Sequence, residues 1–180
     1  MFIVAAPSGA GKTTLCHEVR KRFSDMLYSI SYTTRPLRKG EQEGVDYHFI
    51  TAGDFKNGIT AGKWAEWALV HGNYYGTSVE FLDKGLADGR DILLDIDVQG
   101  TRKILEHYPN SVAIFILPPS LEVLQQRLIA RGTDSEENIA VRLQNAKKEI
   151  AHKDLFHHTI VNDQLSKAVS QLISVIEGYR

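Results

Sequence analysis

Short apolar runs alternate along the chain with segments in which apolar residues recur every three or four positions. The runs at 2–5, 92–97, 112–117 and 158–161 are typical of buried parallel strands. Between these runs, the periodicity predicts helices at about 13–22 and 99–108. It also predicts one helix that begins at 121, one that ends at about 150 and one that begins at 164. Because strands and helices alternate, the pattern predicts an α/β fold with a mostly parallel sheet.

The region 31–77 departs from this pattern, with short strands, glycines and aromatic residues. Strands are expected at 27–31, 47–50, 64–67 and 73–76, and a loop over 32–41. We interpret 31–77 as a small β-rich lobe inserted into the core. The predicted single domain thus has a core (1–30, 78–125 and 152–180), this lobe and a helical lid (126–151).

Several polar residues are expected to mark the ends of helices. Thr77 and Glu80 have the spacing of a capping box, which predicts a helix from there to about Ala87. Ser120 is expected to cap the helix that begins at 121, and Asp163 is expected to cap the last helix. The highly charged helix of the lid is expected to begin near Thr133.

A glycine-bearing segment joins the first strand to the first helix, which is the context of a phosphate-binding loop. It comprises Ala6, Pro7, Ser8, Gly9, Ala10, Gly11, Lys12, Thr13 and Thr14. The glycines leave room for backbone N–H groups to surround an anion. Lys12 is expected between the outer phosphates of a nucleotide, and Thr13 on its magnesium ion. Ala6 stands where the usual pattern has glycine, but its methyl group is a small intrusion. The alternative is a plain turn beside a surface lysine.

Composition limits the classes of function that need to be considered. The chain has 180 residues, 43% of them hydrophobic, and a formal net charge of -1, so no overall field favours nucleic acid or anionic membrane. Cys16 is the only cysteine, which excludes an intrachain disulfide. No stretch resembles a leader or a membrane span, so we expect a cytoplasmic protein.

Two groups of arginines are candidates for binding phosphate. Arg127, Arg131 and Arg142 lie on the two expected helices on either side of Gly132. That arrangement predicts a lid that closes on a polyanion, although a solvated helical face with ordinary salt bridges is the alternative. A second group precedes and enters the β-rich lobe and consists of Arg35, Arg38, Tyr47 and Tyr75. Arginine forks and tyrosine hydroxyls both suit phosphate oxygens.

Taken together, the motifs resemble the guanylate kinase family in order and register over nearly the whole chain. The matching segments are 6–12, 33–35 with Arg38, 40–41, 46–47, 66–68, 72–77, 95–100 and 131–133. The resemblance implies a P-loop kinase that converts ATP and GMP to ADP and GDP with Mg²⁺, within purine nucleotide metabolism. It implies no nucleic-acid, membrane or obligatory protein partner.

The resemblance also implies roles for individual residues. Arg35, Arg38, Tyr47 and Tyr75 would hold the GMP phosphate, while Ser31, Glu66 and Thr77 would hold guanine. The chemistry agrees, because a carboxylate complements the N–H donors of guanine and would face a lone pair of adenine. For Glu66 the alternative is a strand carboxylate that faces solvent.

The remaining roles concern ATP, the metal and catalysis. The phosphate loop, Arg127 and Arg131 would bind ATP, and Asn162 would contact adenine. Since Asp95 and Asp97 alternate along a strand, they should differ in role: Asp95 is expected near Mg²⁺ with Thr13, and Asp97 on the GMP side. Catalysis is assigned to Lys12, Arg38, Arg131 and Arg142.

No general base is needed, because the second pKa of a phosphate monoester is about 6. The seven histidines show no spacing typical of a metal site. Two alternative functions remain: a ribose bisphosphate phosphokinase of similar build, and a non-enzymatic guanylate-kinase-like module that binds phosphorylated peptides. The guanine-binding set argues against the first, and the intact phosphate loop against the second.

Overall fold

The computed structural model describes residues 1–70, 72–130, 132 and 134–180. The chain divides into two compact units, each built from several segments. One unit comprises Met1, 25–94 and 99–111, and the other comprises 2–24, 95–98 and 112–180. We refer to them as the acceptor unit and the donor unit, after the groups of candidate site residues that each contains.

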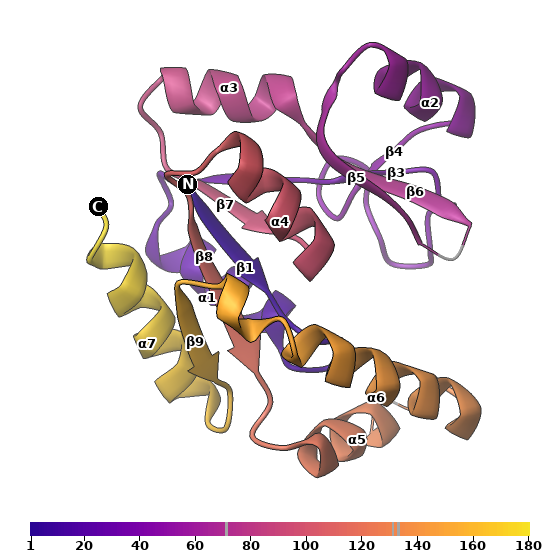
Figure 1. Ribbon diagram of the computed structural model, residues 1–180, viewed down its shortest axis with the longest axis vertical. Coiled ribbons are helices and arrows are strands. Elements are labelled where there is room, and N and C mark those ends of the chain that lie inside the picture. Colours follow the sequence, from indigo (N-terminus) through magenta and orange to yellow (C-terminus); the bar gives the residue numbers. More distant parts are fainter. Residues whose placement is uncertain (71, 131, 133) are drawn as a thin grey trace. The chain divides into compact units, whose positions relative to one another are not determined.

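The donor unit is built on three parallel strands, β1 (Phe2–Ala5), β8 (Val112–Leu117) and β9 (His158–Val161). β8 lies between the other two, with Phe2 opposite Val112 and Ile114 opposite His158 (Figure 1). All of β1 and most of β8 are buried, as expected of parallel strands covered on both faces. The apolar runs therefore predicted these strands correctly.

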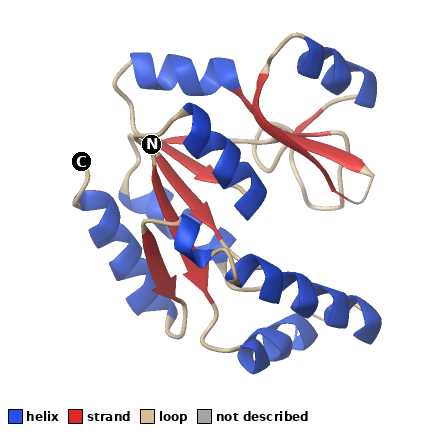
Figure 2. Cartoon of the chain, in the orientation of Figure 1, coloured by secondary structure: helices blue, strands red, loops and turns tan. Residues whose placement is uncertain are grey.

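Helices cover the strands of the donor unit. They are α1 (Lys12–Arg22), α5 (Leu121–Ala130), α6 (Glu136–Ile150) and α7 (Leu165–Glu177), with a short 3₁₀ helix, η1 (Lys153–Leu155). α1 packs against α7, and α5 packs against α6 around Leu124, Leu128 and Ile139 (Figure 2). Burial of these aliphatic side chains stabilises the α5–α6 pair by roughly 1.5–3 kcal/mol per side chain.

The acceptor unit contains a four-stranded sheet in the order β4-β3-β6-β5. Its strands are β3 (Tyr32–Thr33), β4 (His48–Phe49), β5 (Trp64–Val70) and β6 (Asn73–Ser78). The unit also contains the parallel pair β2 (Leu27–Ser29) and β7 (Ile92–Asp95), of which Asp95 belongs to the donor unit. Its helices are α2 (Ala52–Thr60), α3 (Val79–Ala87) and most of α4 (Val98–His107). The predicted α/β class with a parallel sheet and a β-rich lobe is confirmed.

An aromatic cluster joins α2 to one face of the four-stranded sheet. The ring of Phe55 stacks between Trp64 and Tyr74, with centroid distances of 4.5 and 5.1 Å. Gly76 lies under the same ring, and a Cβ atom there would collide with Phe55. The cluster therefore occupies the α2 side of the sheet and leaves the other face for polar side chains.

Helix α2 was not predicted from the sequence, and Tyr32–Thr33 was predicted to be part of a loop. Thr51 caps α2 by accepting a hydrogen bond from the backbone N–H of Asp54, which is local chemistry that the sequence shows. The helix is nevertheless short and contains two glycines, which weaken its periodic pattern. β3 is only two residues long, and its pairing with β6 rather than its own composition makes it a strand.

Two predicted caps were also wrong. Ser78, not Thr77, caps α3, because its side chain accepts from the N–H of Phe81. Thr77 lies in β6 with its hydroxyl turned toward another strand. α7 is preceded by Gln164 without a side-chain cap, so Asp163 does not serve that role. Ser120 does cap α5, through Val123 N–H at 3.2 Å.

Candidate active site

The phosphate loop lies between β1 and α1 in the donor unit. Gly9 and Gly11 have φ angles of 97° and 95°, a region that residues with a side chain rarely adopt. A Cβ atom on Gly9 would press against Leu124 and Leu128 of α5. The N–H of Ala10 donates to the carbonyl of Pro7 at 3.0 Å, which closes a turn within the loop. The loop is therefore a defined structure packed against α5, which argues against a plain turn on the surface.

Lys12, the first residue of α1, is held at the carboxyl end of β7. Its ammonium forms an ion pair with Asp95 and donates to the carbonyl of Ile96 at 3.1 Å. Burial works against the charge, but attraction to Asp95, the hydrogen bond to it and the charge of Asp97 outweigh that effect, so the pKa of Lys12 is raised. Lys12 therefore stays fully protonated at neutral pH, as binding of phosphate oxygens requires.

Asn162 follows β9 and is buried, with 6% of its surface exposed. Its side-chain amide donates to the carbonyl of Ala10 in the phosphate loop at 2.8 Å. The guanidinium of Arg127 donates to the backbone carbonyl of Asn162 at 2.9 Å. Two residues expected to bind ATP are thus connected to the loop or to each other.

Of the residues in the predicted lid, Arg142 has contacts that place it near the phosphate loop. Arg142 of α6 donates to the hydroxyl of Ser8 at 3.2 Å and pairs with Asp134 at the same distance. It therefore lies beside the phosphate loop, and its ion pair is not with the glutamates that a solvated helical face would use. Gly132 has a φ of 64°, as a turn between two helices requires. Arg131 and Thr133 lie outside the described residues.

In the acceptor unit, two threonines explain where Arg35 is placed. The hydroxyl of Thr33 donates to the carbonyl of Tyr74 at 3.0 Å, and that of Thr34 accepts from the N–H of the same residue at 2.9 Å. These bonds attach the chain to β6 immediately before Arg35, whose own N–H bonds the Thr33 hydroxyl. The Thr-Thr-Arg motif is therefore a device that fixes the starting point of the arginine side chain.

The guanidinium of Arg35 is buried and engaged by Glu41. Both of its terminal nitrogens donate to the Glu41 carboxylate at 2.8 Å, and the group lies over the ring of Tyr47 at 5.2 Å. The hydrogen bonds from Arg35, and to a smaller degree the N–H of Arg38, lower the pKa of Glu41 to about 2, although burial opposes this. The pKa of Arg35 is raised, first by the bond to Glu41 and also by one to Tyr75.

Three of the four residues predicted to bind the acceptor phosphate are close together. The rings of Tyr47 and Tyr75 meet edge to face at 5.9 Å, beside Arg35. The side chain of Arg38 is exposed, while its N–H bonds Glu41. Ser31 is half-buried and its carbonyl accepts from His48 N–H. The structure thus gathers Arg35, Tyr47 and Tyr75 into one group.

Glu66 and Thr77 form a buried polar pair on neighbouring strands. They are in register between β5 and β6, and the Thr77 hydroxyl donates to the Glu66 carboxylate at 2.7 Å. Glu66 is only 7% exposed, so it is not a solvent-facing strand carboxylate. Thr77 and Tyr75 are two residues apart on β6 and therefore point to the same face, roughly 7 Å apart. A buried acid consequently shares one face of the sheet with the arginine–tyrosine group.

The chain thus carries a phosphate loop in one unit and, in the other, a buried acid on the same sheet face as an arginine–tyrosine group. The family model described as guanylate kinase matches residues 1–179. The chain belongs to the guanylate kinase family.

Individual guanylate kinases are similar to the chain over its whole length. The guanylate kinase of Syntrophotalea carbinolica is 50% identical over 182 residues, covering 100% of this chain and 87% of that protein. The guanylate kinase of Thermotoga maritima is 42% identical over 180 residues, with 100% and 87% coverage. The crystal structure of guanylate kinase from Anaplasma phagocytophilum matches with a TM-score of 0.80 at 30% identity, covering 99% of this chain and 85% of that one. The predicted family and enzyme class are confirmed.

In a guanylate kinase, the protein ligands of Mg²⁺ should be hydroxyl and carboxylate oxygens, and water molecules should be the remaining ligands of the ion. Thr13 is exposed at the start of α1, and Asp95 lies beside Lys12. Among the described residues there is no cluster of three or more His, Cys, Asp or Glu side chains that could hold a metal by themselves. Thr13 and Asp95 fit an ion that keeps most of its water and is bound together with a nucleotide.

The strand predicted over 92–97 ends at Asp95, so Asp97 lies in the short segment before α4 and does not alternate with Asp95 along a strand. The two carboxylates also have different surroundings. Asp95 is in direct contact with Lys12, whereas Asp97 is exposed and acts on Lys12 through its charge. Asp97 also acts on Glu149 of α6, whose pKa is raised to about 7, first by burial and then by the charge of Asp97, with Lys12 opposing. One carboxylate oxygen of Glu149 is buried without a hydrogen-bond partner among the described residues.

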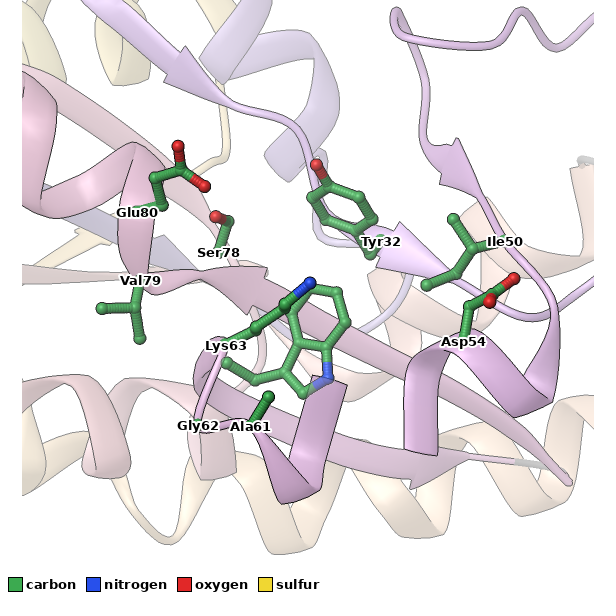
Figure 3. Close-up of a pocket in the computed structure, with 10 residues that line it drawn as sticks. Tyr32, Ile50, Asp54, Ala61, Gly62, Lys63, Ser78, Val79 and Glu80 are labelled. Atoms are coloured by element: carbon green, nitrogen blue, oxygen red, sulfur yellow. The ribbon is translucent and has the colours of Figure 1, made fainter. Parts of the chain in front are cut away.

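A cavity of about 410 Å³ in the acceptor unit is distinct from the predicted binding residues. Trp64 is among the side chains that line it, together with Tyr32, Lys63, Asp54 and Glu80, and Figure 3 shows the last four around the cavity. Tyr32 precedes Thr33 in β3, so the two point to opposite faces of the sheet. The cavity therefore lies on the α2 side, away from the face that carries Tyr75 and Thr77.

The contacts that three residues make in the site were not predicted from the sequence. Glu41 was seen as part of a motif, but its bidentate bond to Arg35 depends on the path of the loop. Glu149 is one of several glutamates in a charged helix, and nothing in its spacing distinguishes it. Asn162 was identified for a different contact. The spacing of the Thr33-Thr34-Arg35 motif from Glu41 was the one feature of the sequence that could have indicated the bond between Arg35 and Glu41.

Among the described residues, no helix is long and apolar enough to cross a membrane.

Proposed function

We propose that this member of the guanylate kinase family transfers the γ-phosphoryl group of ATP to GMP and releases ADP and GDP. The observation that carries the choice of acceptor is the buried Glu66–Thr77 pair on the same face as Arg35, Tyr47 and Tyr75. A base-reading acid and a phosphate-binding group on one face suit a nucleoside monophosphate.

The Glu66 carboxylate supports guanine over adenine by hydrogen-bond matching. Guanine offers two adjacent N–H donors on its Watson–Crick edge, which a carboxylate can accept together. Adenine places a lone pair at the corresponding ring nitrogen, so Glu66 would face an acceptor and lose a bond in a buried site. Such a mismatch supports discrimination of about 10⁴-fold. Ser31 and Thr77 would add hydroxyl contacts to the base.

The acceptor phosphate would be held by Arg35, Arg38, Tyr47 and Tyr75. Glu41 occupies the fork of Arg35, so the carboxylate keeps that fork in place and would yield part of it to an incoming phosphate. No general base is required, because the acceptor is already mostly ionised at neutral pH. Asp97 is assigned to the GMP side of the reaction.

The donor triphosphate would bind in the loop from Ala6 to Thr14. Its backbone N–H groups and the N-terminus of α1 supply positive potential, and Lys12 would exchange part of its contact with Asp95 for phosphate oxygens. Arg127 and Asn162 would complete the ATP site. Thr13 and Asp95 would hold Mg²⁺, which when bound neutralises charge on the phosphates.

Catalysis would consist of positioning and charge neutralisation by Lys12, Arg38, Arg131 and Arg142. Arg142 supports this assignment because it lies beside Ser8 of the phosphate loop. Closure of the lid would bring its arginines onto the transferring group and exclude water, which limits wasteful hydrolysis of ATP. The reaction belongs to purine nucleotide metabolism, in the cytoplasm, and needs no obligatory protein partner.

The test is ADP production by the purified protein with ATP and Mg²⁺ across GMP, AMP, CMP, UMP and ribose bisphosphate. Turnover confined to GMP and abolished in Lys12→Ala is expected. Activity with ribose bisphosphate alone would contradict the acceptor. Tight GMP binding without turnover would favour a non-enzymatic binding module.

A further inference from the structure

The side chain of Asn162 forms a hydrogen bond with the backbone of the phosphate loop, a contact that binding of a nucleotide base does not require. Its amide nitrogen donates to the carbonyl of Ala10 at 2.8 Å in a buried environment. Its own backbone is held on both sides, because its N–H donates to Leu117 at 2.8 Å and its carbonyl accepts from Arg127. The side chain is thus a short, rigid connection from the end of β9 to the loop.

The direction of the Ala10 carbonyl determines the direction of the next N–H. In a planar trans peptide, the C=O and the N–H point to opposite sides. Asn162 draws the Ala10 carbonyl toward itself, so the N–H of Gly11 in the same peptide must point the opposite way. Gly11 has a φ of 95°, and a Cβ atom there would collide with the Asn162 amide, so the two residues are also matched sterically.

From these contacts we infer that Asn162 is a positioning residue that fixes the backbone of the phosphate loop, and through it the affinity for the phosphates of the donor. The inference rests on the proposed function in taking the loop as the donor site. It differs from the role expected for Asn162, in which its side chain touches adenine. One N–H of the amide is already used within the protein, and the residue exposes only 6% of its surface.

The two roles can be separated with a ligand that has phosphates but no base. We would measure dissociation constants by calorimetry for ATP, inorganic tripolyphosphate and GMP, the first two with Mg²⁺. The variants are Asn162→Ala and Asn162→Asp, the second of which preserves shape but replaces the donor by an acceptor. Asn110→Asp makes the same chemical change at an exposed site of the other unit and serves as the control.

Loss of one hydrogen bond in a buried loop should weaken ATP and tripolyphosphate by the same factor, roughly 3- to 10-fold. Asn162→Asp should weaken both at least as much, because a carboxylate would face the Ala10 carbonyl. GMP affinity should stay at the wild-type value. Hydrogen exchange at the amides of Ala10 and Gly11 should be faster in both variants without any ligand.

Weakening of ATP alone, with tripolyphosphate unchanged, would show that Asn162 contacts the base and would overturn the inference. An unchanged affinity for both ATP and tripolyphosphate would also overturn the inference. A loss of GMP affinity as large as the loss of ATP affinity in both variants would overturn it too, because it would indicate a general structural role for Asn162. A wild-type protein that binds tripolyphosphate but does not phosphorylate GMP would contradict the proposed function alone. The comparison of variants on tripolyphosphate would still decide the role of Asn162.

Discussion

The hydroxyl of Thr77 donates a 2.7 Å hydrogen bond to the carboxylate of Glu66, and both side chains are buried. The pair is formed across β5 and β6, whose register places the two residues opposite each other. A hydroxyl has a single hydrogen, so its direction is set by Glu66, and its lone pairs stay available to accept from another group. The pair therefore offers acceptors, not donors, to a ligand.

Glu66→Gln should weaken GMP binding by at least about 10²-fold, because an amide presents a donor where the guanine edge also donates. ATP affinity should change by less than about twofold, since the change lies in the acceptor unit. Titration calorimetry with each nucleotide measures both effects. Glu106→Gln, on the exposed surface of α4, is the matched control. Equal weakening of both nucleotides would point to misfolding instead of a lost base contact.

Arg142→Ala should lower kcat by about 10²-fold or more, because a cation beside the phosphate loop is lost from the charge-neutralising set. The KM for GMP should change little. Steady-state kinetics with both substrates varied would separate these parameters. Lys148→Ala removes a positive charge from the exposed surface of the same helix and should keep normal turnover. Wild-type turnover in Arg142→Ala would exclude a catalytic role for this arginine.

Glu41 should stabilise the fold in a pH-dependent way. Its pKa is lowered from 4.5 to about 2, so the stabilisation is present above 4.5 and is lost as the pH falls toward 2. Glu41→Gln should lower the urea midpoint at pH 7, by roughly 0.3 M because the pair is partly exposed. The difference between the two proteins should shrink as the pH falls toward 2 and should vanish only below it. A difference that persists unchanged at that pH would contradict the lowered pKa.

Glu149 should have the opposite effect on stability. Its pKa is raised from 4.5 to about 7, so its ionisation costs free energy of folding as the pH rises through that interval. Glu149→Gln should therefore be more stable than the wild type at pH 8, by about 1 kcal/mol once the exposed part of the side chain is allowed for, or a Tm higher by about 2–4 °C. At pH 4.5 the two should melt together.

Thermal unfolding at both pH values, with Glu137→Gln as the exposed control on the same helix, measures this difference. A gain in Tm that is equal at pH 4.5 and pH 8 would show that packing, not charge, separates Glu149→Gln from the wild type.

The sequence predicted well those features that depend on neighbours along the chain. The buried strands β1 and β8 are continuous apolar runs, and the phosphate loop is a contiguous motif between a strand and a helix. Helix α2 escaped prediction because its two glycines weaken the periodic signal and its stability comes from Phe55 stacking on Trp64 and Tyr74. Such ring contacts form only once distant segments have been brought together.

By itself, the sequence determined the family, the α/β class and the types of side chain that could meet nucleotides, because these follow from contiguous motifs and local periodicity. The tertiary structure decided which partners those side chains take. Arg35 is bound by Glu41, Asn162 holds the phosphate loop, and Glu66 is buried against Thr77. Each of these contacts depends on strand register or loop path, which are set by the packing of the whole unit and not by the residues next to each partner in the chain.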